Sequence, residues 1–425
     1  MNRPLFFCLL VVVALFAARV PVSAEEWSRF RGPNGTGESE VTTIPDNWTD
    51  HELNWNVKLP GLGISSPIIW GTRLFILSAE ADGKTRYVLC YDAITGKQLW
   101  ERRFESTPYH LHKQSSYASS TPAADAEYVF TAWATPDHTT VMALTHEGDA
   151  VWKKDLGTWR SQHGFGTSPI VVDDLVILSC SQEPFNGPDT VPEPESFMIA
   201  LDRKTGKERW RTPRKTAVTS YSVPAIFQPK NRPEQLVSTS TGNGLFALDI
   251  QTGKELWSKI IFDKRTVSSP LVKQDLIFGS TGSGGGGNYL IAAHSEGEEP
   301  EMVYKMDSQA PYVPAVVARG DLLFLVGDAG IATCLDLRSG KVHWRNRIGG
   351  NFASSPVRAH DKLICVSSDG EVVILRADKE FQELGRVTLG EGTRATPAIA
   401  NGRLYLRTYS QLMSVGGPEK SAEKP

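Results

Sequence analysis

The sequence predicts an all-β fold: a closed ring of eight four-stranded antiparallel blades, which is an eight-bladed β-propeller. A short motif with a proline recurs eight times, a turn motif ending in tryptophan alternates with it, and helical periodicity is almost nowhere sustained. The 37 glycines and 26 prolines favour many turns and short strands. A length of 425 residues is typical of two or three domains, but the repeats assign this chain to one ring.

The first motif is a small or hydroxylated residue, then a proline, then a run rich in strand-forming residues, as in SSPIIW and TSPIVV. Successive copies lie on average about 47 residues apart, a spacing found in propellers and other repeat arrays. A proline is tolerated at the start of a strand, so each copy marks the beginning of a blade. The eight prolines are Pro67, Pro122, Pro169, Pro224, Pro270, Pro314, Pro356 and Pro397.

The second motif reads CYDAITGKQLW in its first copy and ALDIQTGKELW in a later one. Its aspartate can accept backbone N–H bonds as the chain turns, and its glycine supplies a positive φ. One four-stranded unit cannot cover the tryptophan that follows, so we expect a neighbouring blade to cover it. Tyr304 and Leu384 replace the tryptophan in the fifth and seventh blades, where we expect less rigid seams. The motif residues are Asp92, Asp202, Asp249 and Asp336, with Trp100, Trp152, Trp210, Trp257 and Trp344.

The last repeat is incomplete, because it stops at Ser414 without a tryptophan turn. The segment LNWNVKLPG, residues 53–61, carries a motif-like Trp55 ahead of the first proline motif. We expect this N-terminal strand to complete the last blade. Such closure between the chain ends removes the exposed edges that an open array would leave. The propeller is therefore assigned to residues 53–415.

The N-terminus has the features of a secretory signal peptide over residues 1–24. Arg3 precedes a 14-residue apolar stretch, and Val22-Ser23-Ala24 offers small residues for cleavage. No comparable apolar run follows and no cysteine begins the mature chain, so we expect an exported, periplasmic or secreted protein without a transmembrane segment or lipid anchor. Residues 25–52 form a leader segment, here called the leader, and residues 416–425 are predicted to be a disordered tail.

The net charge and the cysteines argue against two further classes of protein, nucleic-acid-binding proteins and disulfide-bonded ones. The formal charge of −3 becomes −5 when the signal peptide takes two arginines and no acid with it, which argues against a nucleic-acid partner. Four cysteines remain, each inside an apolar run, and we expect buried thiols rather than disulfides. They are Cys90, Cys180, Cys334 and Cys365. We expect a monomer.

Candidate binding residues lie in the long loops on the face opposite the Thr-Gly-Lys turns, because long loops on a rigid scaffold commonly carry function. His110 and His112 form a His-x-His pair, and His163 belongs to the equivalent loop of the next blade. Together they suit zinc or copper, but exposed loop histidines are the favoured interpretation, so no metal site is predicted.

A second group of loop residues is expected to point toward the channel mouth. Aromatic and arginine side chains around a cavity suit an anionic or planar ligand; alternatively they cap loop carbonyls and pack between blades. The residues are Tyr221, Arg265, Tyr312, Asn351 and Arg394. The run Gly282–Gly287 lacks the lysine and helix of a phosphate-binding loop and is interpreted as a hairpin tip.

The alternation of Ser/Thr-Pro and A-x-D-x-x-T-G-K-x-x-W over residues 53–415 resembles the pyrroloquinoline-quinone (PQQ)-like repeat propellers. That family includes the eight-bladed quinoprotein alcohol dehydrogenases and the non-catalytic barrel-assembly protein BamB. The dehydrogenase activity implies PQQ and calcium at the ring centre, an aspartate base and a vicinal disulfide. This chain has no adjacent cysteines, and Asp263, Asp307 and Asp328 form no recognisable ligand set.

The resemblance therefore implies an exported, non-catalytic binding or scaffold protein similar to BamB, with a protein, peptide or glycan partner on the loop face. No cofactor and no catalytic residue are expected. The alternative is a PQQ- and calcium-dependent quinoprotein dehydrogenase.

Overall fold

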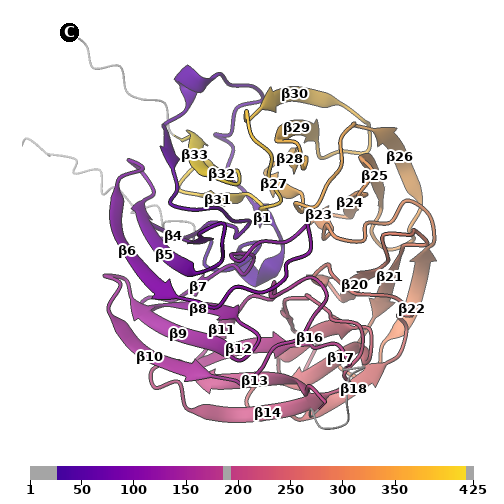
Figure 1. The fold of residues 1–425 in the computed structure, drawn as a ribbon. Helices are drawn as coiled ribbons and strands as arrows, with labels where there is room; N and C mark the ends of the chain where they lie inside the picture. Colours follow the sequence, from indigo (N-terminus) through magenta and orange to yellow (C-terminus); the bar gives the residue numbers. More distant parts are fainter. Residues whose placement is uncertain (1–25, 185–192, 418–425) are drawn as a thin grey trace, which may run out of the picture.

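The computed structural model describes residues 26–184 and 193–417, so the predicted signal peptide and most of the predicted tail lie outside the described residues. Of the 33 strands, β2 to β33 form eight four-stranded blades arranged in a ring (Figure 1), which confirms the predicted all-β propeller; β1 adds a fifth strand to the seventh sheet. The helices of this part of the chain are two single turns, η1 (Pro33–Gly35) and η2 (Asp50–Glu52). No helix within the described ranges is long and apolar enough to cross a membrane.

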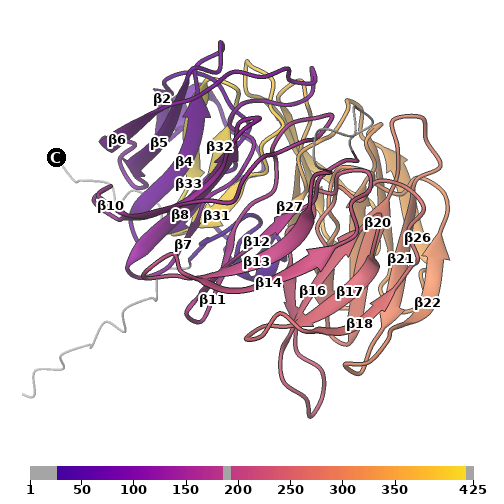
Figure 2. The same cartoon turned by 60° about the horizontal axis from the view of Figure 1, so that its bottom comes forward.

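In the first seven blades the chain runs outward from the channel through four antiparallel strands (Figure 2). The first strands are innermost, because they contact one another around the ring. The first four blades are β3 (Ile68–Trp70), β4 (Arg73–Ala79), β5 (Thr85–Asp92) and β6 (Gln98–Glu105); β7 (Ala123–Ala124), β8 (Tyr128–Ala134), β9 (Thr139–Thr145) and β10 (Ala150–Asp155); β11 (Ile170–Val172), β12 (Leu175–Cys180), β13 (Ser196–Asp202) and β14 (Glu208–Arg214); and β15 (Ala225–Phe227), β16 (Gln235–Ser240), β17 (Gly244–Asp249) and β18 (Glu255–Lys259).

The eighth blade closes the ring with strands from both ends of the chain. β2 (Trp55–Lys58) pairs antiparallel with β33, and Trp55 lies opposite Ser414, which confirms the predicted closure. The remaining strands are β19 (Leu271–Lys273), β20 (Leu276–Thr281), β21 (Tyr289–His294) and β22 (Glu301–Met306); β23 (Val317–Arg319), β24 (Leu322–Val326), β25 (Ile331–Asp336) and β26 (Val342–Arg347); β27 (Val357–Ala359), β28 (Lys362–Val366), β29 (Glu371–Arg376) and β30 (Glu383–Thr388); and β31 (Ala398–Ala400), β32 (Arg403–Arg407) and β33 (Gln411–Gly416).

The motif tryptophans pack on the turn of the following blade, as the sequence predicts. Trp210 is 7% exposed, and its Nε1 donates to the carbonyl oxygen of Ile250 at 2.9 Å. Gly253 lies so close beneath the indole that a Cβ there would be 2.5 Å from a ring carbon, and its φ is +69°. Only glycine satisfies both conditions without strain. The same indole-to-carbonyl bond joins Trp55 to Ala93, Trp100 to His146, Trp152 to Arg203, and Trp344 to Asp378.

Three seams depart from this pattern, and at one of them Leu384 of the seventh blade has no polar group to donate. Tyr304 takes the tryptophan position in the fifth blade, and its hydroxyl donates to the carbonyl oxygen of Leu337 at 3.1 Å. Trp257 instead donates to Gln235 Oε1 at 2.9 Å, and Gln235 Nε2 donates onward to the carbonyl oxygen of Gly297. The glutamine thus replaces the direct contact, because the fifth blade has no Thr-Gly-Lys turn to receive the indole.

The motif aspartates hold the turns as predicted. Asp202 Oδ1 accepts the Thr205 hydroxyl at 2.8 Å and the backbone N–H of Thr205 at 2.9 Å. These bonds favour the carboxylate, so they lower the pKa of Asp202; the Ser339 hydroxyl lowers the pKa of Asp336 in the same way.

Acid is therefore expected to weaken the fold through these turns. A carboxylate whose pKa is lower in the folded state stabilises the fold above its unfolded pKa, and this contribution is lost as the pH falls below about 4. We expect Asp202→Asn to lower the urea midpoint at pH 7 and to lose less further stability than the wild type between pH 7 and pH 3. Asp369→Asn, at an exposed position, is the control. An identical acid response of Asp202→Asn and the wild type would contradict this role.

Loops on the two ends of the ring differ in kind. One end of the ring, here called the turn face, carries the turns between first and second strands and those between third and fourth strands. In the first blade these two turns are joined by a hydrogen bond from Ala93 N to Thr72 O. The other end, here called the loop face, carries the inter-blade loops and the loops between second and third strands. There Leu62, before the first blade, pairs with Ala79 at the end of β4. The longest loops lie on the loop face, as predicted.

The four cysteines of the described chain are unpaired and buried in strands, which confirms the prediction. Burial raises the pKa of Cys90, Cys180 and Cys334 to about 12. At neutral pH these thiols are protonated and take part in core packing.

The leader crosses the channel at the turn face, a role that the sequence does not predict. β1 (Glu38–Ser39) pairs in parallel with β27 and lies near the centre of the ring (Figure 1). Trp27, 1% exposed, exchanges two backbone hydrogen bonds with Ile69 of the first blade. Ser28 accepts the backbone N–H of Ala124 in the second blade.

Two buried arginines tie the leader to the opposite side of the ring. Arg29 Nη2 donates to Pro224 O at 2.5 Å in the fourth blade. Arg31, 1% exposed, donates to Val316 O at 2.6 Å and to Pro356 O at 3.1 Å, in the sixth and seventh blades. Burial lowers the pKa of Arg29 to about 9 and that of Arg31 to about 10, where a nearby carboxylate partly offsets it, so both remain charged at neutral pH.

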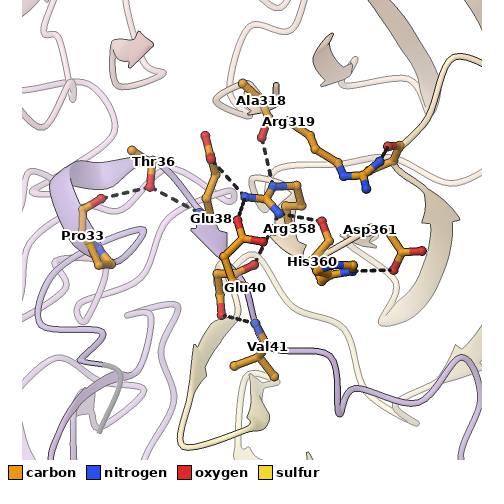
Figure 3. A network of polar contacts seen from close by, with 12 residues as sticks. Pro33, Thr36, Glu38, Glu40, Val41, Ala318, Arg319, Arg358, His360 and Asp361 are labelled. Atoms are coloured by element: carbon orange, nitrogen blue, oxygen red, sulfur yellow. Dashed lines mark hydrogen bonds and ion pairs between the residues drawn. The ribbon is translucent and has the colours of Figure 1, made fainter. Parts of the chain in front are cut away.

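An ion-pair network anchors the end of this crossing (Figure 3). Arg358 Nη2 donates to Glu38 Oε2 at 3.1 Å and to Glu40 Oε1 at 2.6 Å, while its Nε donates to Ala318 O at 3.0 Å. Lys273 of the fifth blade adds a second cation 2.7 Å from Glu38 Oε2. The leader thus contacts blades on every side of the channel.

Candidate binding site in the central channel

The residue before each blade proline lines the channel. In six blades it is a serine or threonine whose hydroxyl oxygen accepts a backbone N–H from the preceding blade; Thr396 N donates to Ser66 Oγ, and Ser66 N donates to Thr121 Oγ1, both at 3.0 Å. Val223 and Val313 occupy this position in the fourth and sixth blades and accept no such bond. This contact explains the hydroxylated residue of the motif. The accepting residues are Ser66, Thr121, Ser168, Ser269, Ser355 and Thr396.

A second layer comes from the residue three positions before the proline, which faces the same side because extended chain alternates. Tyr221 belongs to the fourth blade and Arg394 to the eighth, so they lie on opposite sides of an eight-membered ring. The residues of this layer that line the channel are Ile64, Ser119, Gly166, Tyr221, Val267, Ala353 and Arg394.

The arginine at the loop-face rim of the pocket, Arg265, is paired with a carboxylate. Arg265 Nη2 donates to Glu183 Oε1 at 2.8 Å and to Gln162 Oε1 at 3.1 Å. Burial raises the pKa of Tyr312, although the neighbouring Arg265 opposes this shift. Burial likewise raises the pKa of Tyr221, whose hydroxyl lies beside Ser161 without a hydrogen bond of normal geometry. Both phenols are neutral hydrogen-bonding groups at physiological pH.

His163 adds an uncharged group to the rim. Burial, Arg265 and His112 together lower the pKa of His163 to about 4. The His112 and His163 rings meet edge to face with centroids 4.2 Å apart. At neutral pH the imidazole of His163 is therefore neutral and adds no cation to the rim.

Phe30 of the leader closes the channel from the turn face. It lines the same cavity as Arg394 and Tyr221, which makes the channel a pocket open toward the loop face. The cavity encloses about 1070 Å³ of empty space, counting the solvent in its open mouth. This volume suits one small molecule.

The charge of this pocket is unbalanced. None of the lining residues in the described chain is an aspartate or a glutamate. Arg265 has Glu183 as its partner, whereas the guanidinium of Arg394 has no hydrogen bond or ion pair within residues 26–184 and 193–417. A buried or half-buried guanidinium in this state is a strong site for a planar anion.

The predicted site residues separate into two groups. Tyr221, Arg265, Tyr312, Arg394 and His163 line the pocket together. The remaining three do not line it: His112 packs on His163, His110 lines a separate groove of the loop face, and Asn351 is exposed.

The histidines do not form a metal site in this arrangement. Within the described chain no group of three or more His, Cys, Asp or Glu side chains is placed to hold a metal ion. His112 and His163 touch, but His110 lies among the residues of the separate groove with Tyr109 and Trp159.

Sequence reasoning missed Phe30, the layer of pre-proline residues, and the second layer apart from Tyr221 and Arg394. The layers carry a signal, because they occupy the positions one and three residues before each blade proline. Phe30 carries none, since the leader is outside the repeats and its course across the channel depends on buried contacts of Arg29 and Arg31.

A calcium-bound quinone does not fit these residues. Calcium requires oxygen ligands from carboxylates and amides, and the lining side chains offer one amide, Gln114, and no carboxylate. The candidate acids are engaged elsewhere: Asp263 accepts the Tyr289 hydroxyl, Asp307 pairs with Lys305, and Asp328 accepts the backbone N–H groups of Tyr312 and Val313.

Eight blades with hydroxyl-proline starts and tryptophan-bearing turns define a PQQ-like repeat propeller. The model of the family described as outer membrane protein assembly factor BamB matches residues 84–308 and 301–380, which is more than half of the chain. The chain belongs to this family. No curated protein matches it in sequence.

Solved structures share the fold at low identity. BamB from Moraxella catarrhalis is 15% identical with a TM-score of 0.60, covering 87% of this chain and 98% of its own. A europium-containing methanol dehydrogenase is 15% identical with a TM-score of 0.66, over 92% and 90% of the two chains. Quinohemoprotein alcohol dehydrogenase from Comamonas testosteroni is 12% identical with a TM-score of 0.67, over 94% and 82%. At this level of identity the similarities show the fold alone, so the function has to be argued from the residues of the site.

Proposed function

We propose that this chain is an exported, non-catalytic binding protein whose loop face docks a protein partner. The observation that carries the proposal is the set of polar groups in the channel: hydroxyls, one amide, one neutral histidine and two arginines among apolar side chains, with no carboxylate or thiolate among the described lining residues and no group of three metal ligands in the described chain. Such a set supplies groups for binding, but in the described chain His163 makes no hydrogen bond to a hydroxyl that it could activate as a nucleophile. Membership of the BamB family supports docking of a protein rather than of a glycan.

The docking surface is the groove over the second and third blades. Its residues come from four loops: Tyr109 and His110 precede the second blade, Asp137 lies between β8 and β9, Trp159 and Arg160 precede the third blade, and Glu183 follows β12. Aromatic, cationic and proline side chains together are typical of protein interfaces.

Site-specific photo-crosslinking tests this surface in the cells that produce the protein. We expect benzoylphenylalanine at Asp137, an exposed groove residue, to give a discrete adduct with one protein. The same label at Lys207, exposed on the turn face, is the matched control and is expected to give none. The adduct should be lost in His110→Ala. Adducts from Lys207 alone, or an adduct unaffected by His110→Ala, would overturn the assignment of the groove.

The dehydrogenase alternative is tested separately on purified protein. We expect no PQQ-dependent dye reduction, and no effect of calcium on the absorbance or tryptophan fluorescence of a mixture with PQQ. Calcium-dependent, saturable quenching together with dye reduction would replace the binding proposal by the enzyme.

A further inference from the structure

We propose that the central channel is a binding pocket for one small carboxylate with an apolar, preferably aromatic, body. This inference goes beyond docking of a protein on the groove, and either can fail while the other holds. It depends on three features of the pocket: an uncompensated cation, an aromatic ring with apolar side chains across the channel from that cation, and a floor formed by the leader.

The cation is Arg394. Its guanidinium has no partner in the described chain, and no acidic side chain of the described chain lines the cavity to neutralise it. A guanidinium binds a carboxylate through two parallel N–H bonds, which satisfy its donors and its charge together. Arg265, the other lining arginine, already has Glu183 at 2.8 Å. The pocket therefore favours one carboxylate over two or three.

The side chains that line the pocket determine what the ligand carries besides its carboxylate. Tyr221 stands across the ring from Arg394 in the same layer, and its ring offers an aromatic face at the far side of the pocket. Val223 and Val313 interrupt the hydroxyl layer beneath them, while Val267 adds a further apolar side chain. A ligand whose carboxylate reaches Arg394 thus places its other end among apolar groups.

The floor limits the length of the ligand. Phe30 lines the cavity from the turn face, and its backbone is held by the contacts of Arg29 and Arg31 with three blades. A ligand that enters from the loop face therefore has its carboxylate and its apolar body between Phe30 and the rim. An aromatic ring of naphthalene size suits a cavity of this class.

Titration calorimetry with 2-naphthoate and its neutral counterpart 2-naphthamide tests the proposal on the full-length mature protein. We expect 2-naphthoate to bind about ten-fold or more tightly than 2-naphthamide, because only the carboxylate can pair with the guanidinium. Arg394→Gln is expected to remove that preference and to leave the affinity for the amide unchanged. Arg394→Lys, which keeps the charge without the fork, should retain part of the preference.

Arg345→Gln, the same change on the exposed outer strand β26, is the matched control and should bind as the wild type does. Phe30→Ala should weaken both probes alike, because it removes floor contact and no charge. Equal affinity of the wild type for the two probes, absence of binding by both, or a preference that survives in Arg394→Gln would overturn the proposal. Crosslinking from Asp137 does not involve Arg394, so it reports on the docking surface alone.

Discussion

Replacing Arg31 by methionine is expected to lower the free energy of unfolding by about 3–5 kcal/mol, because a buried cation that satisfies several carbonyls is removed and those carbonyls lose their partner. The guanidinium of Arg31 is 1% exposed and donates to carbonyl oxygens of two blades and of the leader itself, at Gly35 and Thr36. Methionine fills similar space but offers no donor.

The backbone of Arg31 adds to this effect. Its φ is +64°, a conformation that costs a non-glycine residue roughly 1 kcal/mol and persists only where the surroundings impose it. Once the guanidinium contacts are lost, this backbone strain favours release of the leader from the channel.

Equilibrium unfolding in urea, followed by tryptophan fluorescence, measures the change. Arg345→Met is the control, since Arg345 is exposed on β26, and it should change stability by less than about 0.5 kcal/mol. Arg31→Lys should fall between methionine and the wild type, because one ammonium cannot reach all four carbonyls. A loss below about 1 kcal/mol for Arg31→Met would show that the leader is dispensable for the ring.

Trp210→Ala is the second large effect, and we expect it to destabilise the protein by about 3–5 kcal/mol. The indole is 7% exposed, packs on Gly253 of the next blade and donates to Ile250 O at 2.9 Å. Truncation leaves a cavity at the seam between the third and fourth blades, and it leaves a carbonyl without its donor.

Leu256→Ala provides the control, because Leu256 is 43% exposed on β18 and its truncation removes little buried area. Thermal and urea unfolding of the two variants should differ by several kcal/mol. If Trp210→Ala costs less than about 1 kcal/mol, the tryptophan does not hold the seam between blades.

Much of this fold could be predicted because the same short motif recurs, and several copies together specify a structure that one copy does not. One Thr-Gly-Lys turn is an ordinary hairpin signal, but several copies with a tryptophan at a fixed offset require neighbouring blades to cover the indoles. The closing strand was predictable for the same reason, since Trp55 stood before the first proline motif and the last blade lacked its own tryptophan.

The site was predictable only in part. Tyr221 and Arg394 are inter-blade loop residues whose positions three residues before a proline place them in one layer of the pocket. Asn351 is an inter-blade loop residue too, but it lies five residues before Pro356, is exposed and does not line the pocket. The floor was not predictable, since contacts between Phe30 or Arg31 and distant blades leave no periodic trace in the sequence.

The two valines in the hydroxyl layer divide the ring into unequal parts. Hydrogen bonds to the pre-proline hydroxyls run without interruption from the sixth blade, where Ala315 N is the donor, through the eighth and first blades to the third; in this layer the fourth and fifth blades bond only to each other. The leader bonds to the fourth blade through Arg29 and Asn34 and to the sixth through Arg31, which are the two blades that carry valine. The leader therefore holds the two blades at which this layer of hydrogen bonds is interrupted, and we expect its loss to weaken the attachment of the fourth and sixth blades more than that of the other blades.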